Sequence, residues 1–330
     1  MIELYRMTAP LVAEAAREVE CLLLGIFEHG DYNFGAALSG EYSDTLNCTF
    51  FLAKYKSQLV GAAGCLYALK DPAICVVGPV GVAPEHRGRG IGTNLVTSLL
   101  KHVRHNDCVA AYLGVAQGSS ARRLYESLGF RPLRGIVMQH LLRPQPQFEE
   151  DYFHRCDDTD IRRVEWGDLP GIALLASLPC TMYTFDLRRG VFSSRYVDPA
   201  RFLSIFPEMM QAHEIHGGLA NVLTAGPQKN IVGVAHFCRL PDEAQPHIVQ
   251  LDFYVHDNFL DRAELLVRKT IEESKTFSLR SLCCHCLECD RLKQGIIEAL
   301  GAKRTAVLAS NVLLSGRYGN VFVYEWPALF

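Results

Sequence analysis

The sequence predicts a mixed α/β fold that occurs twice along the chain, and two observations lead to this prediction. Strand-like and helix-like segments alternate in the same order in both halves. In addition, 59–63 (Leu-Val-Gly-Ala-Ala) matches 231–235 (Ile-Val-Gly-Val-Ala), and 126–129 matches 298–301, at one spacing of 172 residues (231 minus 59, 298 minus 126). Two matches at one spacing favour a tandem repeat.

The elements of the first half follow from residue periodicity. Alternating apolar residues favour strands, apolar residues at every third or fourth position favour helices, and Gly or Pro marks the turns between them. We expect, in order, a strand over 3–7, helical segments over 9–24, a hairpin over 50–69, a strand over 74–82, a helix over 90–104, a strand over 108–115, a helix over 119–128 and closing strands to 142.

The second half repeats this order after a linker. Pro144, Pro146 and an acidic patch interrupt the periodic pattern, so we expect a first domain over 1–145, a linker over 146–158 and a second domain over 159–330. Its expected elements lie at 161–166, 169–178, 222–239 (a hairpin), 248–255, 260–274, 279–286, 291–300 and a final hairpin.

Composition narrows the class of protein. The 330 residues are 49% hydrophobic and 21% charged, which is typical of a globular protein. With 33 basic and 36 acidic residues, the net charge of -3 argues against a nucleic-acid partner. The N-terminus shows no apolar leader and no run long enough to cross a bilayer, so we expect a cytoplasmic protein without a membrane partner.

The most informative segment is a glycine-rich turn between the strand over 74–82 and the following helix. It reads Ala-Pro-Glu-His-Arg-Gly-Arg-Gly-Ile-Gly-Thr over 83–93. Glycines allow close approach of the backbone, and the first-turn N–H groups of a helix attract phosphate. The arginines Arg87 and Arg89 can add charge-assisted hydrogen bonds. The turn therefore predicts an anion site, although neither the Walker pattern nor the dinucleotide fingerprint fits its spacing.

The pattern R-x-x-G-x-G at Arg87, Gly90 and Gly92 resembles the acyl-CoA signature of the GCN5-related N-acetyltransferase (GNAT) superfamily, and Ala121 to Phe130 resembles the A-x-x-x-Y-E-x-L-G-F helix of that family. The resemblance implies two tandem GNAT-like acyl-CoA acyltransferase folds. It also implies residues that hold acetyl-CoA through backbone or side-chain groups: Val80, Gly81, Val82, Arg87, Gly88, Arg89, Gly90, Ile91, Gly92 and Thr93.

The same resemblance assigns the catalytic acid to Tyr125, whose phenol would protonate the departing thiolate. A core aromatic residue is the structural alternative for this position. The asparagine that commonly precedes the tyrosine by seven residues in the family is Gly118 here, so Ser119 is the candidate for the corresponding cofactor contact.

The implied reaction moves an acetyl group from acetyl-CoA to a primary amine of a small metabolite. A non-catalytic acyl-CoA-binding module and another reaction of a CoA thioester, such as hydrolysis or decarboxylation, remain alternatives. No base lies on the strand over 74–82, and His86 is expected at the surface. The candidates for the base are Asp71, Glu28, His29, Asp31 and Glu41, each of which is also an ordinary surface residue type. The acceptor and the oligomeric state stay open.

The second half lacks the anion site. At the spacing of 172 residues, Phe259, Arg262 and Glu264 replace Arg87, Gly90 and Gly92, and Ile297 replaces Tyr125. Acidic residues near a helix start would repel a pyrophosphate, so we expect a degenerate copy.

A cysteine-rich run follows the pattern of either a zinc site or a core strand. Cys283, Cys284, Cys286 and Cys289 lie among the 12 cysteines of the chain, with C-x-x-C spacings. The repeat places the run on a buried strand, where thiols behave as small apolar side chains. We therefore expect core cysteines and no metal.

Overall fold

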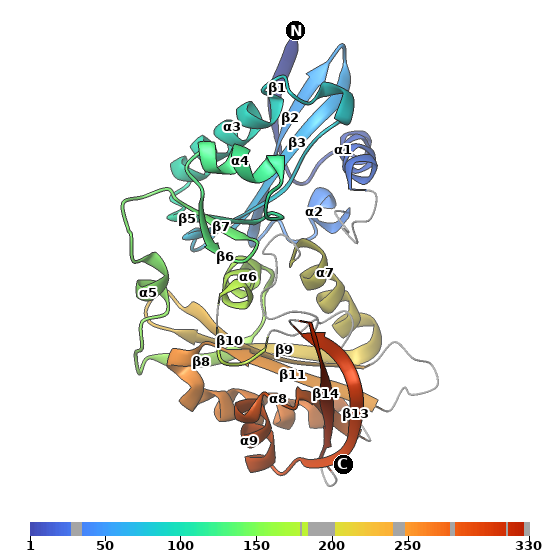
Figure 1. Cartoon of the computed structure of the whole chain (residues 1–330), viewed down its shortest axis with the longest axis vertical. Coiled ribbons are helices and arrows are strands. Elements are labelled where there is room, and N and C mark those ends of the chain that lie inside the picture. The colour runs from blue at the N-terminus through green and yellow to red at the C-terminus, as the bar shows by residue number, and fades with distance from the viewer. Residues whose placement is uncertain are drawn as a thin grey trace. The chain divides into compact units, whose positions relative to one another are not determined.

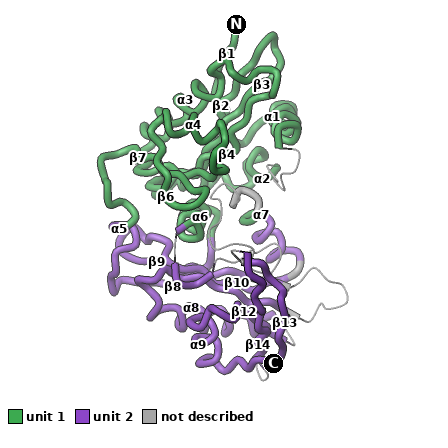
Figure 2. Tube along the Cα trace, in the orientation of Figure 1, with its two compact units in different colours: residues 1–149, 165–177, 198–207 green, residues 150–164, 178–197, 208–330 purple. Residues whose placement is uncertain are grey.

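The computed structural model describes residues 1–27, 35–178, 180–183, 202–239, 248–277, 281–314 and 316–326 (Figure 1). These residues form two seven-stranded sheets in two compact units. Unit 1 comprises residues 1–149, 165–177 and 198–207, and unit 2 comprises residues 150–164, 178–197 and 208–330 (Figure 2).

Unit 1 follows the order expected from the sequence. Its strands lie in the order β1-β2-β3-β4-β5-β7-β6, and all neighbours are antiparallel except β4 and β5. The elements are β1 (Ile2–Thr8), α1 (Ala13–Ile26), α2 (Gly35–Ser39), β2 (Leu46–Tyr55), β3 (Gln58–Ala68), β4 (Ile74–Val82), α3 (Ile91–His105), β5 (Ala110–Gly114), α4 (Ser120–Ser127), β6 (Arg131–Arg134) and β7 (Val137–Leu141).

Helices α1 and α3 cover opposite faces of the first sheet (Figure 1). On β3, a Cβ at Gly61 would lie 3.1 Å from Ile91 and from Leu95, so α3 packs directly on the backbone there. On β4, a Cβ at Gly81 would lie 3.0 Å from Ile26 of α1. The absence of side chains at these two positions lets both helices approach the sheet closely.

A segment from the second half of the sequence completes unit 1. Helix α6 (Leu169–Ser177) packs against β3 and β4, and all nine of its residues are buried. Just before it, Trp166 stacks on Tyr42 with ring centroids 4.5 Å apart. Trp166 also contacts Phe206 at 5.5 Å. The second half therefore contributes a helix to the core of the first sheet, which the sequence did not suggest.

Unit 2 repeats the strand plan of unit 1, with the sheet order β13-β14-β12-β11-β10-β9-β8 and one parallel neighbour pair, β11 and β12. The prediction of two tandem α/β folds is confirmed. The remaining elements are α5 (Phe148–Tyr152), β8 (Thr159–Arg163), α7 (Phe202–Ala212), β9 (Gly218–Ala225), β10 (Asn230–Arg239), β11 (Ile248–Val255), α8 (Ala263–Ser274), β12 (Ser281–Leu287), α9 (Arg291–Ala299), β13 (Lys303–Leu314) and β14 (Arg317–Glu325).

The repeat spacing changes by one residue along the sheet. Gly61 pairs with Val82 and Gly233 pairs with Val255, so the spacing is 172 on β3 (233 minus 61) but 173 on β4 (255 minus 82). Strand β4 also carries a bulge between its pairings with Ala63 and Cys65, and β11 pairs with β10 without one. The two units thus differ at the strand that the sequence associates with the cofactor.

Three local features differ from the sequence expectation. The first helix begins at Ala13 rather than at Ala9, after the segment around Pro10. The expected linker contains the short helix α5, and α7 was not expected. None of the helices in the described ranges combines the length and the apolar character needed to cross a lipid bilayer.

Candidate acyl-CoA site

The candidate site begins where β4 and β5 separate. Their parallel ladder consists of the pairs of Ile74, Cys75 and Val76 with β5, and the rest of β4 continues without a partner on that edge in the described chain. At the end of β4, the N–H of Ala83 donates to the oxygen of Val60 on β3 (2.9 Å). Since backbone groups alternate between the two edges of a strand, Val80 and Val82 direct theirs toward the open edge.

The glycine-rich turn connects this open edge to α3. A single-turn 3₁₀ helix (Pro84–His86) leads into it. Gly88 and Gly90 have φ of +73° and +74°, which L side chains rarely adopt, although a Cβ at either position would meet nothing within 4 Å. These glycines are therefore required by backbone conformation rather than by space.

The N-terminus of α3 is open to an anion. Gly90 is the N-cap, and no side chain caps the helix. The first helical bond runs from the N–H of Asn94 to the oxygen of Gly90 (3.0 Å), so the N–H groups of Ile91, Gly92 and Thr93 have no partner within the helix. Three such donors at the positive end of a helix dipole suit a phosphate.

The arginines of the turn are exposed and differ in their contacts. Arg87 donates from Nε to the oxygen of Val82 (2.9 Å), which holds its guanidinium next to the open edge of β4. Arg89 lies with its guanidinium carbon 6.0 Å from the centroid of the Tyr55 ring. Neither arginine forms an ion pair within the described ranges, so both charges are available to a ligand.

His86 is buried, so the expectation of a surface residue was wrong. Its exposed fraction is 8%, and its ring lies 5.3 Å from the ring of Tyr55. The 3₁₀ turn explains the difference, because it directs the side chain inward from a loop whose other residues are mostly exposed. Nδ1 of His86 is buried without a hydrogen-bond partner in the described part of the chain.

Tyr125 lies on α4 with an exposed fraction of 7%. Its ring packs edge-to-face on Phe130, with centroids 5.6 Å apart. Ser119 caps α4: its Oγ accepts from the N–H of Arg122 (3.2 Å) and donates to the oxygen of Ala116 (2.8 Å). Gly118 has φ of +73°, a conformation that glycine and asparagine tolerate better than other residues. The backbone at this position is therefore compatible with either glycine or asparagine.

The structure describes two of the five candidates for the general base. Glu41 and Asp71 are exposed, and Ser39 donates from Oγ to Glu41 (3.5 Å). Glu28, His29 and Asp31 lie outside the described residues.

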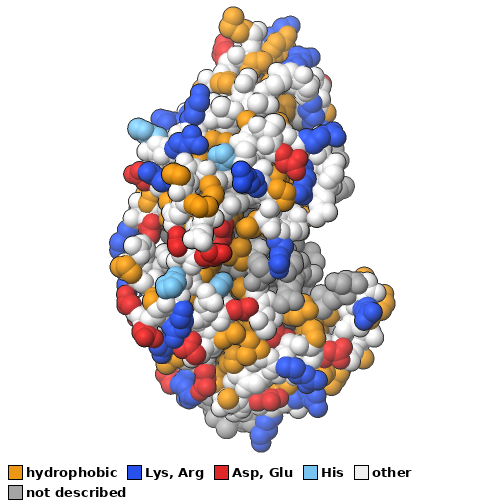
Figure 3. Space-filling view, turned by 60° about the vertical axis from the view of Figure 1, so that its left-hand side comes forward, with side chains coloured by type: hydrophobic (Ala, Val, Ile, Leu, Met, Phe, Trp, Pro, Cys, Tyr) orange, Lys and Arg blue, Asp and Glu red, His pale blue; other side chains and the backbone are white. Residues whose placement is uncertain are grey.

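On the face shown in Figure 3, acidic and basic side chains are interspersed, and neither sign covers a continuous area.

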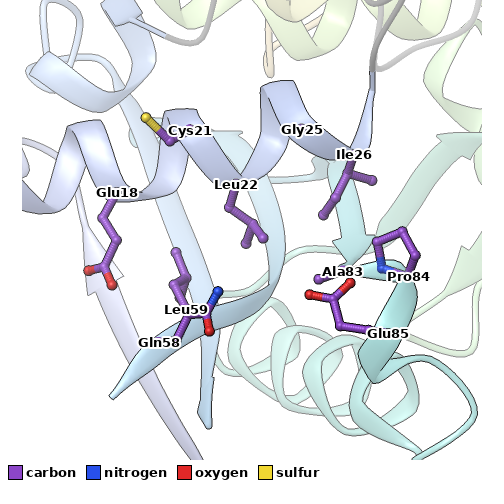
Figure 4. A pocket seen from close by; sticks show the side chains of 10 residues that line it. All are labelled: Glu18, Cys21, Leu22, Gly25, Ile26, Gln58, Leu59, Ala83, Pro84 and Glu85. Carbon is purple, nitrogen blue, oxygen red and sulfur yellow. The ribbon is translucent and has the colours of Figure 1, made fainter. Parts of the chain in front are cut away.

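A cavity of about 430 Å³ lies on the α1 side of unit 1 (Figure 4). The apolar side chains of Leu22 and Ile26 on α1 line one wall, and residues 83–85 line another. Glu18 at its rim pairs with Lys54 at 3.0 Å. No pattern in the sequence predicted this cavity.

In unit 2, the corresponding strands also separate after three pairs, but a salt bridge joins them to α9. Beyond the last pair, at Gln250, Asp252 of β11 accepts a hydrogen bond from Nζ of Lys293 on α9. Lys293 is fully buried and lies 4.9 Å from the Phe253 ring centroid. Burial raises the pKa of Asp252, and the carboxylate raises the pKa of Lys293 although burial opposes that charge.

Leu178, Thr181 and Tyr183 contact the segments at the end of β11 and the start of α9. The hydroxyl of Tyr254 donates to the oxygen of Leu178 (3.3 Å). The N–H of Thr181 donates to Asp257 (2.6 Å), and the N–H of Tyr183 donates to Asp290 at the start of α9 (3.2 Å). In unit 2, polar groups near the end of β11 and the start of α9 thus form hydrogen bonds within the protein. The open edge of β4 and the N-terminus of α3 in unit 1 offer such groups to a ligand.

Three of the four cysteines of the run lie on β12, as the sequence predicted, whereas Cys289 lies beyond the end of the strand, and its expected place in the core was wrong. Cys283, Cys284 and Cys286 are buried, and Cys289 is exposed. Burial raises the pKa of Cys283 to about 12, which is typical of an inert core thiol. Among the described residues, no three His, Cys, Asp or Glu side chains gather as a metal site.

Comparison with known proteins gives a match for part of the first unit. The sequence model of the Acetyltransferase (GNAT) family matches residues 17–130. No curated protein matches the sequence.

Several solved structures resemble half of the chain. An N-acetyltransferase from Staphylococcus aureus Mu50 is 16% identical, covers 51% of this chain and 98% of its own, and has a TM-score of 0.44. The putative acetyltransferase yncA from Salmonella typhimurium, solved with its cofactor acetyl-CoA, is 16% identical, with 51% and 93% covered and a TM-score of 0.43. A phosphinothricin acetyltransferase from Sinorhizobium meliloti in complex with acetyl-CoA is 11% identical, with 51% and 86% covered and a TM-score of 0.41.

Proposed function

We propose that the chain is an acyltransferase that transfers an acetyl group from acetyl-CoA to a primary amine of a small metabolite, and the match of residues 17–130 to the model of the Acetyltransferase (GNAT) family supports this proposal. The observation that carries the proposal is the continuity of two features. The open edge of β4 at Val80 and Val82 leads directly into the turn that ends at the uncapped N-terminus of α3.

This continuity suits an elongated thioester with a pyrophosphate at one end. The peptide groups of Val80 and Val82 offer strand-like hydrogen bonds to the amides of a pantetheine arm, and Gly81 between them keeps the strand close to α1. The turn residues and the first N–H groups of α3 would hold the phosphate groups of CoA, with Ser119 as a further contact. These residues are Arg87, Gly88, Arg89, Gly90, Ile91, Gly92 and Thr93.

The chemistry needs three contributions from the protein. The N–H of Val82 is a donor for the thioester oxygen as negative charge develops on it. The neutral amine attacks the thioester carbon, the C–S bond breaks, and Tyr125 gives a proton to the departing thiolate. The amine must lose its own proton, and the group that accepts it is unassigned.

We propose that unit 2 contributes no second acetyl-CoA site. The turn after β11 carries no glycine, Asp257 and Asp261 stand at the start of the following helix, and the Asp252–Lys293 pair joins β11 to α9. One molecule of CoA per chain is the stoichiometry that this arrangement supports.

The test is a screen of the full chain with acetyl-CoA against free amino acids, amino sugars, diamines and peptides. Thiol release and product mass are measured together. An acetylated small amine supports the proposal. Acetylation of peptides alone would overturn the substrate class, and thiol release without an acetylated amine would indicate hydrolysis of the thioester instead.

A further inference from the structure

A second cationic group lies beside the phosphate turn, on the turn between β2 and β3. Tyr55 is the last residue of β2, and Lys56 and Ser57 form the turn with φ of 48° and 67°. The Nζ of Lys56 lies 5.5 Å from the centroid of the Tyr55 ring, and the guanidinium carbon of Arg89 lies 6.0 Å from the same centroid. Two charges from distant parts of the sequence therefore meet at one aromatic ring.

Neither charge is neutralised. Lys56 and Arg89 form no ion pair in the portion of the chain that the structure describes. Two carboxylates lie on neighbouring elements, and neither forms an ion pair with Lys56 or Arg89: Glu18 pairs with Lys54 at 3.0 Å, and Glu85 lines the cavity beside α1 (Figure 4). Lys56 and Arg89 carry like charges near one ring, and an anion within reach of both side chains would offset the repulsion between these charges. The aromatic face favours the presence of cations but does not cancel their charge.

His86, a residue of the glycine-rich segment, contacts Tyr55 at the turn between β2 and β3. Its ring is more than nine-tenths buried and packs against the ring of Tyr55 at 5.3 Å. Nδ1 of His86 is buried without a hydrogen-bond partner in the described ranges, so this polar side chain is placed by packing rather than by hydrogen bonding at that atom. The turn from β2 to β3 and the glycine-rich turn are thus held together as one surface.

We propose that Lys56 and Arg89 form a subsite for a phosphate monoester, the 3′-phosphate on the ribose of CoA. This inference rests on the proposed function. The N–H groups at the start of α3, together with Arg87, already suit the pyrophosphate. CoA carries one further phosphate, close to a dianion at neutral pH, and the pair of unneutralised cations matches that charge. Lys56 is the new element, since it lies outside the glycine-rich turn.

The test compares the binding of CoA and of 3′-dephospho-CoA to the full chain by calorimetry. The wild-type chain should bind CoA roughly ten- to a hundredfold more tightly, the range expected for charge-assisted hydrogen bonds. Lys56→Gln should reduce this preference while leaving the affinity for 3′-dephospho-CoA unchanged. The preference should also fall as the salt concentration rises. Lys101→Gln, at an exposed lysine of α3, is the matched control and should keep the preference.

Two outcomes would overturn the subsite. In the first, the wild-type chain binds both ligands equally well. In the second, Lys56→Gln weakens both ligands by the same factor, which would indicate a general effect of charge. If neither ligand binds to the wild-type chain at all, the proposed function fails together with the subsite, and this result is distinct from equal binding of both.

Discussion

At the scale of single residues, the two units differ on the strands β4 and β11, which occupy the same place in the two sheets. In unit 1, the N–H of Val82 faces an unpaired edge. In unit 2, Asp252 lies on the equivalent strand and is joined to Lys293. A strand edge with free peptide groups next to an uncapped helix suits a ligand. The Asp252 and Lys293 side chains instead bind each other. The contrast supports the proposal that unit 1 holds the acetyl-CoA site, and it leads to two predictions.

The first prediction concerns Tyr125. Tyr125→Phe should lower kcat by about 10²- to 10⁴-fold, because the variant loses the proton donor to the thiolate. The affinity for CoA should stay within about twofold, because the ring still packs on Phe130. Steady-state thiol release and calorimetry with CoA measure the two quantities. An unchanged kcat would exclude Tyr125 as the acid.

The second prediction concerns the buried ion pair. Lys293→Met should lower the free energy of unfolding by about 3–5 kcal/mol, since it leaves the carboxylate of Asp252 buried without its partner. Adding Asp252→Leu should restore most of this loss. Arg268→Met at the exposed pair with Glu264 is the control and should change stability by less than about 0.5 kcal/mol. A double variant as unstable as Lys293→Met would contradict the role of the pair. Denaturant unfolding gives all four values.

At the scale of elements, the sequence predicted the order of strands and helices well. The periodicity of β3, β4 and α3 is strong because each has one or both faces buried in the core. The sequence did not predict α7, whose residues carry no capping signal, or the packing of α6 on the first sheet, because periodicity shows that a helix is apolar but not what it packs against. An aspartate within the apolar run of β11 was the available signal for the buried pair.

The candidate site was predictable to the extent that it depends on local backbone geometry. Glycines at positive φ and a helix start leave a readable pattern at Gly88 and Gly90. The packing of His86 on Tyr55, and the positions of Lys56 and Arg89 near the same ring, depend on how the two turns pack against each other. Contacts between turns 30 residues apart leave no periodic trace in a single sequence, so these features required the structure.

The third prediction concerns the π-helical turn after α7 and its neighbour β10. Burial lowers the pKa of His213 from 6.5 to about 4, with Arg163 as a further cause. Burial also lowers the pKa of His236 on β10, which pairs across the strands with Asp252 and is influenced by His213 and Lys293. The folded state therefore keeps both rings neutral at pH values where the unfolded chain binds protons.

The sign of the pH effect follows from this difference. Above pH 6.5 neither state is protonated at His213, so the residue contributes no pH dependence. As the pH falls from 6.5 toward 4, His213 should lower the stability by about 1.4 kcal/mol per pH unit, and His236 should act in the same direction. Unfolding curves at pH 7.5, 6 and 5 measure the slope. His105→Gln, at an exposed position, should leave it unchanged, and a stability independent of pH in this window would contradict the prediction.

At the scale of the whole molecule, the division of the sequence differs from the division of the structure. The repeat suggests a cut within 146–158, but residues 165–177 belong to unit 1. Helix α6 buries Leu169, Ile172, Leu174 and Leu175 against the rest of that unit. Each such side chain contributes about 1.5–3 kcal/mol when it is removed from water.

The fourth prediction tests this division with two truncated chains. A chain ending at Ser177 should melt cooperatively, whereas a chain ending at Val164 should be destabilised by more than about 5 kcal/mol, because it exposes the surface of β3 and β4 that α6 covers. The two chains differ only by residues 165–177, so each serves as the control for the other. Equal melting temperatures would show that α6 is dispensable.

The position of α6 also sets an order of events during synthesis. A domain that emerges first from the ribosome usually folds first. Here the first sheet is complete at Leu141, but one of its helices arrives only after β8, a strand of the other sheet, has been made. The apolar surface of β3 and β4 that α6 covers therefore stays exposed in the nascent chain until residue 177 has emerged. A cut of the chain at the boundary of the sequence repeat would separate α6 from the sheet that it covers.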